Sequence, residues 1–143
     1  MLKNSMRVEF PAISENERFA RGVAAAFVIG LDPTLDEISE IKTAVSEAVT
    51  NAIIHGYDKK DGKVVLEGII YEDCVEFTVS DEGVGISDIR RARKPLYTGK
   101  PEDERSGMGF TIMETFMDSV DVESEVGRGT RVIMTKNIKQ VTA

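Results

Sequence analysis

The chain has 143 residues, of which 41% are hydrophobic and 30% charged, with a formal net charge of −7 at pH 7. These values predict one soluble domain over residues 1–143, and the acidic surface argues against direct nucleic-acid binding, which needs basic side chains. No apolar run is long enough to span a membrane, and the N-terminus lacks the apolar core of a signal peptide, so we expect a cytoplasmic protein without membrane contact.

The first elements in chain order are a short strand and a helix. Residues 7–10 read as a strand, and a helix follows to about residue 30. Ser14 precedes the helix and Glu17 comes three residues later, which is the spacing of a capping box. We therefore expect these two side chains to close the N-terminus of this helix.

A second, longer helix begins in the segment LDPTLDE. Asp32 or Thr34 can cap it, and Thr34 with Glu37 forms another capping box. Apolar residues then recur at helical spacing along one broad face. Gly56 follows that pattern and is a natural C-cap, because glycine adopts left-handed backbone angles without strain.

The rest of the chain predicts two hairpins and one short helix. Residues 63–71 and 74–80 are rich in Val and Ile and read as paired strands. A weakly patterned region precedes the segment SGMGFTIMETFM, in which a glycine turn leads into a helix. Residues 118–125 and 130–135 close the chain as two more strands. Hairpins with clustered helices predict an α+β two-layer sandwich, a mixed, mostly antiparallel sheet covered on one face by helices.

Three polar residues lie at intervals of four near the end of the second helix, namely Glu47, Asn51 and His55. Residues four apart on an α-helix differ by only about 40° in direction, so these side chains are expected to share a narrow arc beside the apolar face. On its own, this pattern is typical of the solvated flank of an amphipathic helix. His55 in the last turn can simply cap carbonyl groups or pack.

Three glycine motifs follow the polar helix in order: DEGVGI at residues 81–86, GMGF at residues 107–110 and GRGT at residues 127–130. An aspartate after a strand can accept a hydrogen bond from an exocyclic amine, and neighbouring glycines allow close approach of a ligand. Glycines at a helix start leave free N–H groups that favour phosphate. Each pair alone is usually a turn, but their joint order with the helix is specific.

In this order the motifs E47-xxx-N51-xxx-H55-G56, D81-x-G83-x-G85, G107-x-G109-F110 and G127-x-G129-T130 resemble the N, G1, G2 and G3 boxes of the GHKL ATPase family, which has the Bergerat ATP-binding fold. Within this family, the short chain and the segments SEAVTNAIIHGY and RSGMGFTIMETFMD are most similar to the anti-sigma factor kinases of sporulation. The resemblance implies ATP and Mg²⁺ as cofactors.

The resemblance also implies roles for the matching residues. Asn51 would hold Mg²⁺, whose other ligands would be phosphate oxygens and waters. Asp81 would bind the adenine amine, with Thr130 helping through a water. Gly83 and Gly85 would line the base and sugar side of the nucleotide.

Phosphate binding and catalysis would fall to the second helix and the glycine turn. Glu47 would be the general base, and Arg105 would meet the γ-phosphate. Residues 93–106 would form a mobile ATP lid. The backbone N–H groups on the phosphates would come from the turn, Ser106, Gly107, Met108, Gly109 and Phe110.

The partners implied by the resemblance are two proteins and a second copy of the chain. The protein would inhibit a sporulation sigma factor of the sigma F type and phosphorylate a serine of its anti-anti-sigma protein, acting as a homodimer. Glu17 and Arg21 match charged positions on the partner-binding surface of the family. Their simplest role is a local i, i+4 ion pair.

Three alternatives stay open at this point. The chain would be a kinase of the same type that serves stress response, a binding module that uses ATP only to set its shape, or a plain ATPase without a protein acceptor. The presence of Glu47 argues against the binding module, whereas the chemistry of the residues does not separate the first alternative from a sporulation kinase.

Overall fold

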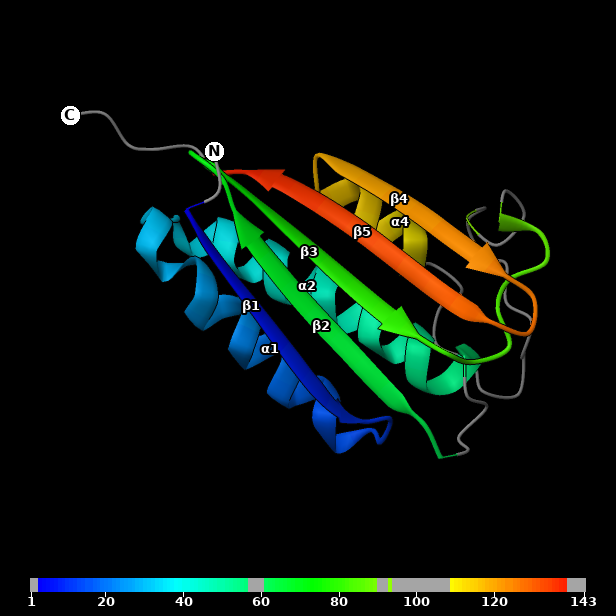
Figure 1. The fold of residues 1–143 in the computed structure, drawn as a ribbon. Coiled ribbons are helices and arrows are strands. Elements are labelled where there is room, and N and C mark those ends of the chain that lie inside the picture. Colours follow the sequence, from blue (N-terminus) through cyan, green and yellow to red (C-terminus); the bar gives the residue numbers. More distant parts are fainter. Residues whose placement is uncertain (1–2, 57–60, 90–92, 94–108, 139–143) are drawn as a thin grey trace.

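The fold consists of two layers, an antiparallel sheet and a layer of helices on one of its faces (Figure 1). The computed structural model describes residues 3–56, 61–89, 93 and 109–138. The described elements follow in the order β1 (Asn4–Pro11), α1 (Glu15–Val28), η1 (Ile29–Leu31), α2 (Leu35–Asn51), η2 (Ala52–Gly56), β2 (Lys63–Ile70), β3 (Cys74–Asp81), α4 (Gly109–Phe116), β4 (Ser119–Glu125) and β5 (Gly129–Asn137). The predicted order of strands and helices is confirmed.

The five strands form one sheet in the order β1-β2-β3-β5-β4. All four pairings among these strands are antiparallel, whereas we expected a mixed, mostly antiparallel sheet. The reason is the connectivity, because β2–β3 and β4–β5 are hairpins and the chain returns after two helices to place β2 antiparallel to β1. The register places Asp81 opposite Thr130 at one end of β3 and β5. The α+β two-layer prediction is otherwise confirmed.

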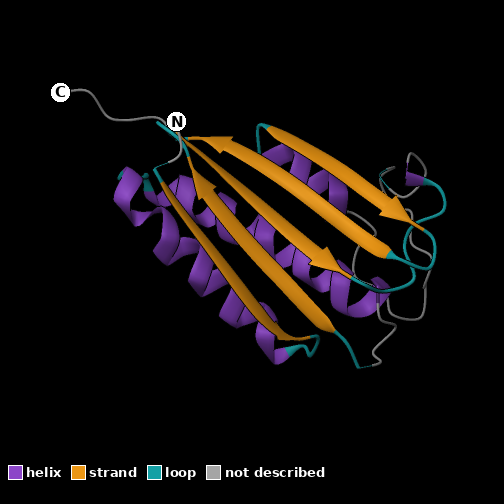
Figure 2. Cartoon of the chain, viewed as in Figure 1, coloured by secondary structure: helices purple, strands orange, loops and turns teal. Residues whose placement is uncertain are grey.

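The hydrophobic core lies between the sheet and the helices α1, α2 and α4 (Figure 2). Alternate residues of the strands point into it, as the period of two in their burial shows. The central helix α2 contributes a fully buried stripe at helical spacing, Ile41, Ala44, Val45, Ala48 and Val49. The core therefore fixes which face of α2 is turned away from it and carries the polar residues.

The two predicted capping boxes have different outcomes. At α2 the box is present, because the Thr34 side chain accepts from the Glu37 N–H at 3.0 Å and the Glu37 carboxylate accepts from the Thr34 N–H at 2.9 Å. At α1 the prediction is wrong, since Ser14 has helical backbone angles and makes no side-chain cap. The Glu17 carboxylate binds Ser46 of α2 instead, so a contact between helices replaces the local one.

The end of α2 differs from a regular helix. The Ala52 N–H is shared between the carbonyl groups of Ala48 and Val49, and Ala52–Gly56 continues as a π-helical turn. The prediction that Gly56 is the C-cap of one continuous α-helix is therefore wrong. Because hydrogen bonds in a π turn reach one residue further, the spacing of four no longer has its α-helical meaning beyond Asn51.

The short helix α4 is held in place at its C-terminus by Lys136 of β5. The Lys136 ammonium donates to the Phe116 carbonyl at 2.6 Å and lies 3.3 Å from a Glu40 carboxylate oxygen on α2. Only 8% of Lys136 is exposed. A cation at the carbonyl end of a helix is favourable, so Lys136 joins the sheet and α2 to the C-terminus of α4. No helix within the described ranges is long and apolar enough to cross a membrane.

Candidate nucleotide-binding site

The structure brings the polar residues of α2 to the N-terminus of α4. A Cβ atom placed on Gly109 would lie 3.2 Å from Asn51 Nδ2, 3.4 Å from Asn51 Oδ1 and 3.4 Å from Glu47 Oε2. Both side chains therefore face the first residue of α4, where backbone N–H groups are free. This arrangement places a carboxylate, an amide oxygen and the N–H groups of a helix N-terminus, which favour anions, within one small region.

Phe110 and His55 are two further predicted residues of this region. Phe110 has its side chain in the hydrophobic core, with 8% exposed, so only its backbone is available to a ligand. The side chain of His55 is outside the described part of the chain, and the predicted line of three is thus supported for Glu47 and Asn51 alone.

Asp81 ends β3 with a carboxylate that accepts two backbone hydrogen bonds. The Gly83 N–H donates to Asp81 Oδ1 at 2.9 Å, and the Thr130 N–H also donates to this carboxylate. Burial raises the pKa of Asp81, and the two N–H groups partly oppose this change. Asp81 is thus oriented from both sides and keeps free lone pairs for a further donor, such as an exocyclic amine.

The glycine turns around Asp81 owe their glycines to close approach of two backbone segments. Gly85 has φ of 78°, and a Cβ atom there would lie 2.3 Å from the Glu125 carbonyl oxygen. Gly129 has φ of 109°, and its Cβ atom would lie 2.0 Å from the Asp81 carbonyl oxygen. Both positions therefore exclude other residues. We expected Gly85 to line the nucleotide, but its glycine is explained by packing between the two turns.

Ser124 of β4 is a residue of this region that the sequence analysis missed. Its hydroxyl contacts the backbone of Ile86, the carbonyl group of Gly129 and the hydroxyl of Thr130. The partners lie 38, 5 and 6 residues away in sequence, and serine occurs in many contexts. Only the hairpin register, which places Ser124 opposite Thr130, is a signal that was available beforehand.

Arg93 was likewise not assigned a contact from the sequence, although it opens the predicted lid. Its guanidinium donates to the Glu114 carboxylate of α4 at 2.8 Å and to the Val120 carbonyl of β4 at 2.9 Å. The remainder of the lid, residues 94–106, is outside the described residues. The same holds for four predicted site residues, Arg105, Ser106, Gly107 and Met108.

The predicted partner-binding residues lie on α1, and one of them, Glu17, contacts α2. Arg21 Nε is 3.3 Å from Glu17 Oε1, and the same carboxylate oxygen accepts from the Ser46 hydroxyl. The Arg21 and Glu17 side chains are 36% and 24% exposed. Ser46 directly precedes Glu47, so the ion pair on α1 is attached to the turn of α2 that carries the predicted base.

The oxygen donors near Gly109 suit a hard cation that is shared with a phosphate. Asn51 supplies an amide oxygen, and phosphate oxygens and waters are the other ligands that Mg²⁺ prefers. No cluster of three or more His, Cys, Asp or Glu side chains that could hold a metal by itself occurs among the described residues.

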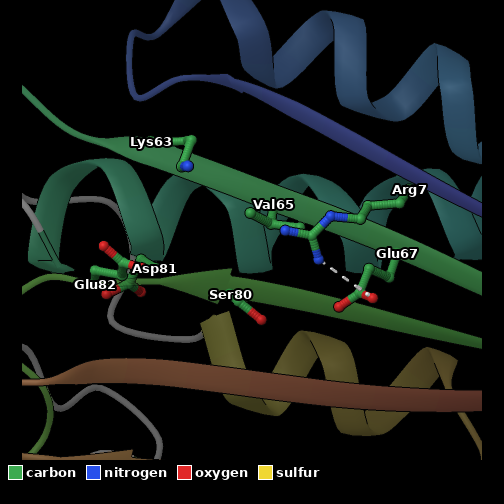
Figure 3. A pocket seen from close by; sticks show the side chains of 7 residues that line it. All are labelled: Arg7, Lys63, Val65, Glu67, Ser80, Asp81 and Glu82. Atoms are coloured by element: carbon green, nitrogen blue, oxygen red, sulfur yellow. Dashed lines mark ion pairs between the residues drawn. The ribbon is translucent and has the colours of Figure 1, made fainter.

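The open face of the sheet carries a shallow hollow near the end of β3 (Figure 3). Arg7 lies across it, with NH1 3.5 Å from Glu67 Oε2. Its lining comes from β1, β2 and β3 and the residue after β3, namely Arg7, Lys63, Val65, Glu67, Ser80, Asp81 and Glu82. Apart from Asp81, these residues do not belong to the predicted site, and most of the charges belong to ion pairs.

These elements define a nucleotide-binding domain of the kinase and ATPase class. The family model described as "Histidine kinase-like ATPase domain" matches residues 10–136. The chain therefore belongs to this family, and the GHKL resemblance stated from its motifs is confirmed.

The relatives within this family share one name. The Anti-sigma F factor of Geobacillus kaustophilus (strain HTA426) is 61% identical over 143 residues, covering 99% of this chain and 98% of the relative. The Anti-sigma F factor of Clostridium perfringens (strain 13 / Type A) is 59% identical over 138 residues, covering 96% and 99%. The similarity to sporulation anti-sigma factors is thus confirmed over nearly the whole length.

Solved structures support the fold at low sequence identity. The RsbU and RsbW domains of Rv1364c from Mycobacterium tuberculosis match with a TM-score of 0.67 and 18% identity, covering 95% of this chain and 32% of that chain. The catalytic domain of the histidine kinase ThkA matches with a TM-score of 0.57 and 15% identity, covering 93% and 96%. ShkA, solved in complex with AMPPNP, matches with a TM-score of 0.62 and 17% identity, covering 91% and 31%.

Proposed function

We propose that this protein is an ATP-dependent anti-sigma factor and protein-serine kinase. It would bind and inhibit a sigma factor of the sigma F type and phosphorylate a serine of the corresponding anti-anti-sigma protein. The observation that carries the kinase part is the meeting of Glu47 and Asn51 at Gly109, the first residue of α4. The regulatory part is supported by the name of relatives that match the chain almost from end to end.

The proposed transfer moves the γ-phosphoryl group of ATP to the serine hydroxyl. The serine oxygen forms a bond to the γ-phosphorus, the bond to the bridging oxygen breaks, and ADP leaves. Glu47 takes the hydroxyl proton, which a positioned carboxylate does efficiently when it lies within hydrogen-bond reach. Such reactions depend mainly on positioning and on neutralising the charge of the transferred group.

The phosphates would be held at the start of α4. N–H groups at the N-terminus of a helix, together with the helix dipole, attract anions. Gly109 has no side chain to obstruct this approach, and Asn51 would contribute its amide oxygen to the shell of Mg²⁺. The ion would neutralise phosphate charge during the reaction. We further propose that Arg105 meets the γ-phosphate, that Ser106, Gly107 and Met108 belong to the phosphate turn, and that residues 93–106 act as the lid.

The adenine would be bound at the opposite end of the site. Asp81 is oriented by two backbone N–H groups and can accept a hydrogen bond from the amine of the base. Thr130 lies opposite Asp81 in the register of β3 and β5 and can reach the base through a water. The turn that carries Gly83 would cover the base and sugar side.

The protein partners would bind at α1, with Glu17 and Arg21 as contact residues. Both residues are partly exposed, and arginine is a frequent anchor of protein interfaces. We also propose that the protein acts as a homodimer of one-domain subunits. The reaction would take place in the cytoplasm, where sigma factors and ATP are found.

The decisive experiment compares Glu47→Gln with the wild type, using radiolabelled ATP and the purified anti-anti-sigma protein. The variant is expected to keep nucleotide affinity and to lose about 10²- to 10⁴-fold in phosphotransfer. Asp36→Asn is the matched control, because it removes an exposed carboxylate from the first turn of the same helix. Transfer by Glu47→Gln near the wild-type rate would exclude Glu47 as the base. Nucleotide binding without transfer by the wild type would favour the ATP-dependent binding module.

A further inference from the structure

The Ser124 hydroxyl is the centre of a hydrogen-bond group that joins two turns of the site. The Ile86 N–H donates to Ser124 Oγ at 2.7 Å, and Ser124 Oγ lies 3.0 Å from the Gly129 carbonyl oxygen and 2.8 Å from Thr130 Oγ1. Ile86 follows the turn that carries Gly83, and Gly129 begins β5. The Ser124 side chain of β4 thus joins the segment at Ile86 to the start of β5 at Gly129, near Asp81.

The number of hydrogens in this group decides the direction of each bond. A serine hydroxyl has one hydrogen and two lone pairs. The Gly129 carbonyl can only accept, so the hydrogen of Ser124 is used there. The Ile86 N–H can only donate and occupies one lone pair of Ser124. The contact with Thr130 is therefore made by the hydrogen of Thr130, and the Ser124 hydroxyl is saturated.

This assignment leaves Thr130 Oγ1 as an acceptor only. Its one hydrogen is bound to Ser124, and only lone pairs remain for a ligand or a water. Thr130 is 9% exposed, and its own N–H binds the Asp81 carboxylate. Neither Thr130 nor the Asp81 carboxylate is therefore free to reorient. The ionised Asp81 carboxylate is also an acceptor. The base end of the site thus presents two neighbouring acceptors.

We propose that Ser124 is a positioning residue that makes the site prefer 6-amino purines over 6-keto purines. This inference rests on the proposed binding of the base at Asp81. Adenine carries an NH₂ donor at position 6, whereas guanine carries an acceptor oxygen there. A keto oxygen facing Asp81 receives no hydrogen from this carboxylate, and Thr130 has no hydrogen left to donate to it. Release of the Thr130 hydrogen would supply a donor to the keto oxygen.

The test measures the dissociation constants of ATP and GTP by calorimetry for Ser124→Ala and the wild type. Ser124→Ala is expected to weaken ATP by about 5- to 10-fold, the value of one hydrogen bond, and to weaken GTP less or strengthen it. The ratio of the two constants therefore moves toward one. Ser124→Thr keeps the hydroxyl and is expected to restore the wild-type ratio.

Ser119→Ala is the matched control, because Ser119 lies on the same strand with an exposed side chain. Equal losses for ATP and GTP in Ser124→Ala, with an unchanged ratio, would overturn the inference and leave only a structural role. If the alanine variant does not fold, Ser124→Cys replaces it, because a thiol makes only weak hydrogen bonds. A wild-type ratio of the ATP and GTP dissociation constants in Ser124→Cys would also overturn the inference.

A third ligand separates this inference from the proposed function. Purine riboside triphosphate lacks the amino group at position 6. If the wild type binds it as tightly as ATP, the assignment of Asp81 to the base is wrong and the inference fails with it. If the wild type prefers ATP and Ser124→Ala keeps the full preference over GTP, only the role of Ser124 is wrong.

Discussion

Gly109 and Asn51 approach each other so closely that an added methyl group at Gly109 would lie 3.2 Å from Asn51 Nδ2. This distance is shorter than an ordinary contact, so the amide would have to move by a few tenths of an ångström. The backbone of Gly109 begins α4, and its φ is not in the left-handed region, so alanine is compatible with the helix itself. The glycine at this position is thus explained by its close approach to Asn51 and not by its backbone angles.

We therefore predict that Gly109→Ala keeps the folding stability and impairs ATP binding and phosphotransfer. A displaced Asn51 would lose about one hydrogen bond or metal contact, which corresponds to roughly 10-fold in affinity. Gly22→Ala is the control, because Gly22 lies in α1 with open space around its Cβ position and should gain about 0.5–1 kcal/mol. Thermal melts and ATP titrations of both variants test this. Wild-type ATP affinity in Gly109→Ala would contradict it.

A second prediction concerns two glycines of one turn. Gly129→Ala is expected to lower the free energy of unfolding by more than about 3 kcal/mol, because the new Cβ atom would lie 2.0 Å from the Asp81 carbonyl oxygen and 2.7 Å from Glu82 Cα. Gly127 also has positive φ, 84°, but nothing lies within 4 Å of its Cβ position. Gly127→Ala should therefore cost only about 1–2 kcal/mol of backbone strain. Urea unfolding of the two variants measures the difference, and equal losses would refute the steric explanation.

Asp81→Asn is predicted to weaken ATP and ADP together, by about 1–3 kcal/mol at neutral pH. The amide has one acceptor oxygen, whereas the carboxylate binds Gly83 and Thr130 and is proposed to bind the base as well. Asp121→Asn, an exposed change on β4, is the control. Unchanged affinities for ATP and GTP in Asp81→Asn would show that this carboxylate does not bind the base.

The pH dependence of stability gives an independent test of Asp81. Burial raises the folded-state pKa above the unfolded value of about 3.9, so folding favours the protonated form. The stability from this group is fully present below the unfolded pKa and is lost as pH rises through the folded pKa. The stability of the wild type minus that of Asp81→Asn is therefore expected to fall from pH 4 toward neutral pH. A difference that rises with pH would contradict the burial of this carboxylate.

The pairs that the sequence predicted correctly are those whose geometry is local. Thr34 and Glu37 close the start of α2 because both partners lie within one turn. Ser14 and Glu17 have the same spacing, yet Glu17 binds Ser46 on another helix. A tertiary contact outweighed a local one, and no spacing within α1 indicates this.

In the candidate site, too, the sequence indicated the residues of motifs but not the contacts between distant segments. The convergence of Glu47 and Asn51 on Gly109 could be expected from motif order and the family resemblance. Ser124 could not, because its partners come from two segments, at Ile86 and at Gly129 and Thr130, that only the folded sheet brings together. The π turn after Asn51 was also missed, since nothing in its residues distinguishes it from a regular helical turn.

The last prediction concerns Arg21, whose guanidinium is proposed to bind both protein partners. Arg21→Ala should weaken capture of the sigma factor and of the unphosphorylated anti-anti-sigma protein by about 2 kcal/mol, the threshold of an interface hot spot, or roughly 30-fold. The ion pair with Glu17 is worth only about 0.2–0.5 kcal/mol, so stability and ATP affinity should change little. Arg131→Ala is the control, because Arg131 also forms one ion pair, with Glu123 at 3.2 Å, but on β5.

Glu17→Ala is expected to weaken the sigma factor complex too, but it also removes the contact with Ser46 between α1 and α2. Ser46→Ala separates these effects, since it breaks the same contact and leaves the charge of Glu17 in place. If Ser46→Ala weakens partner binding as much as Glu17→Ala does, the carboxylate acts by positioning α1 and not by touching the partner. Calorimetry against ATP and each partner decides among these outcomes. Intact partner binding in Arg21→Ala would leave only the ion pair on α1, whereas loss of ATP binding would show that this residue supports the fold.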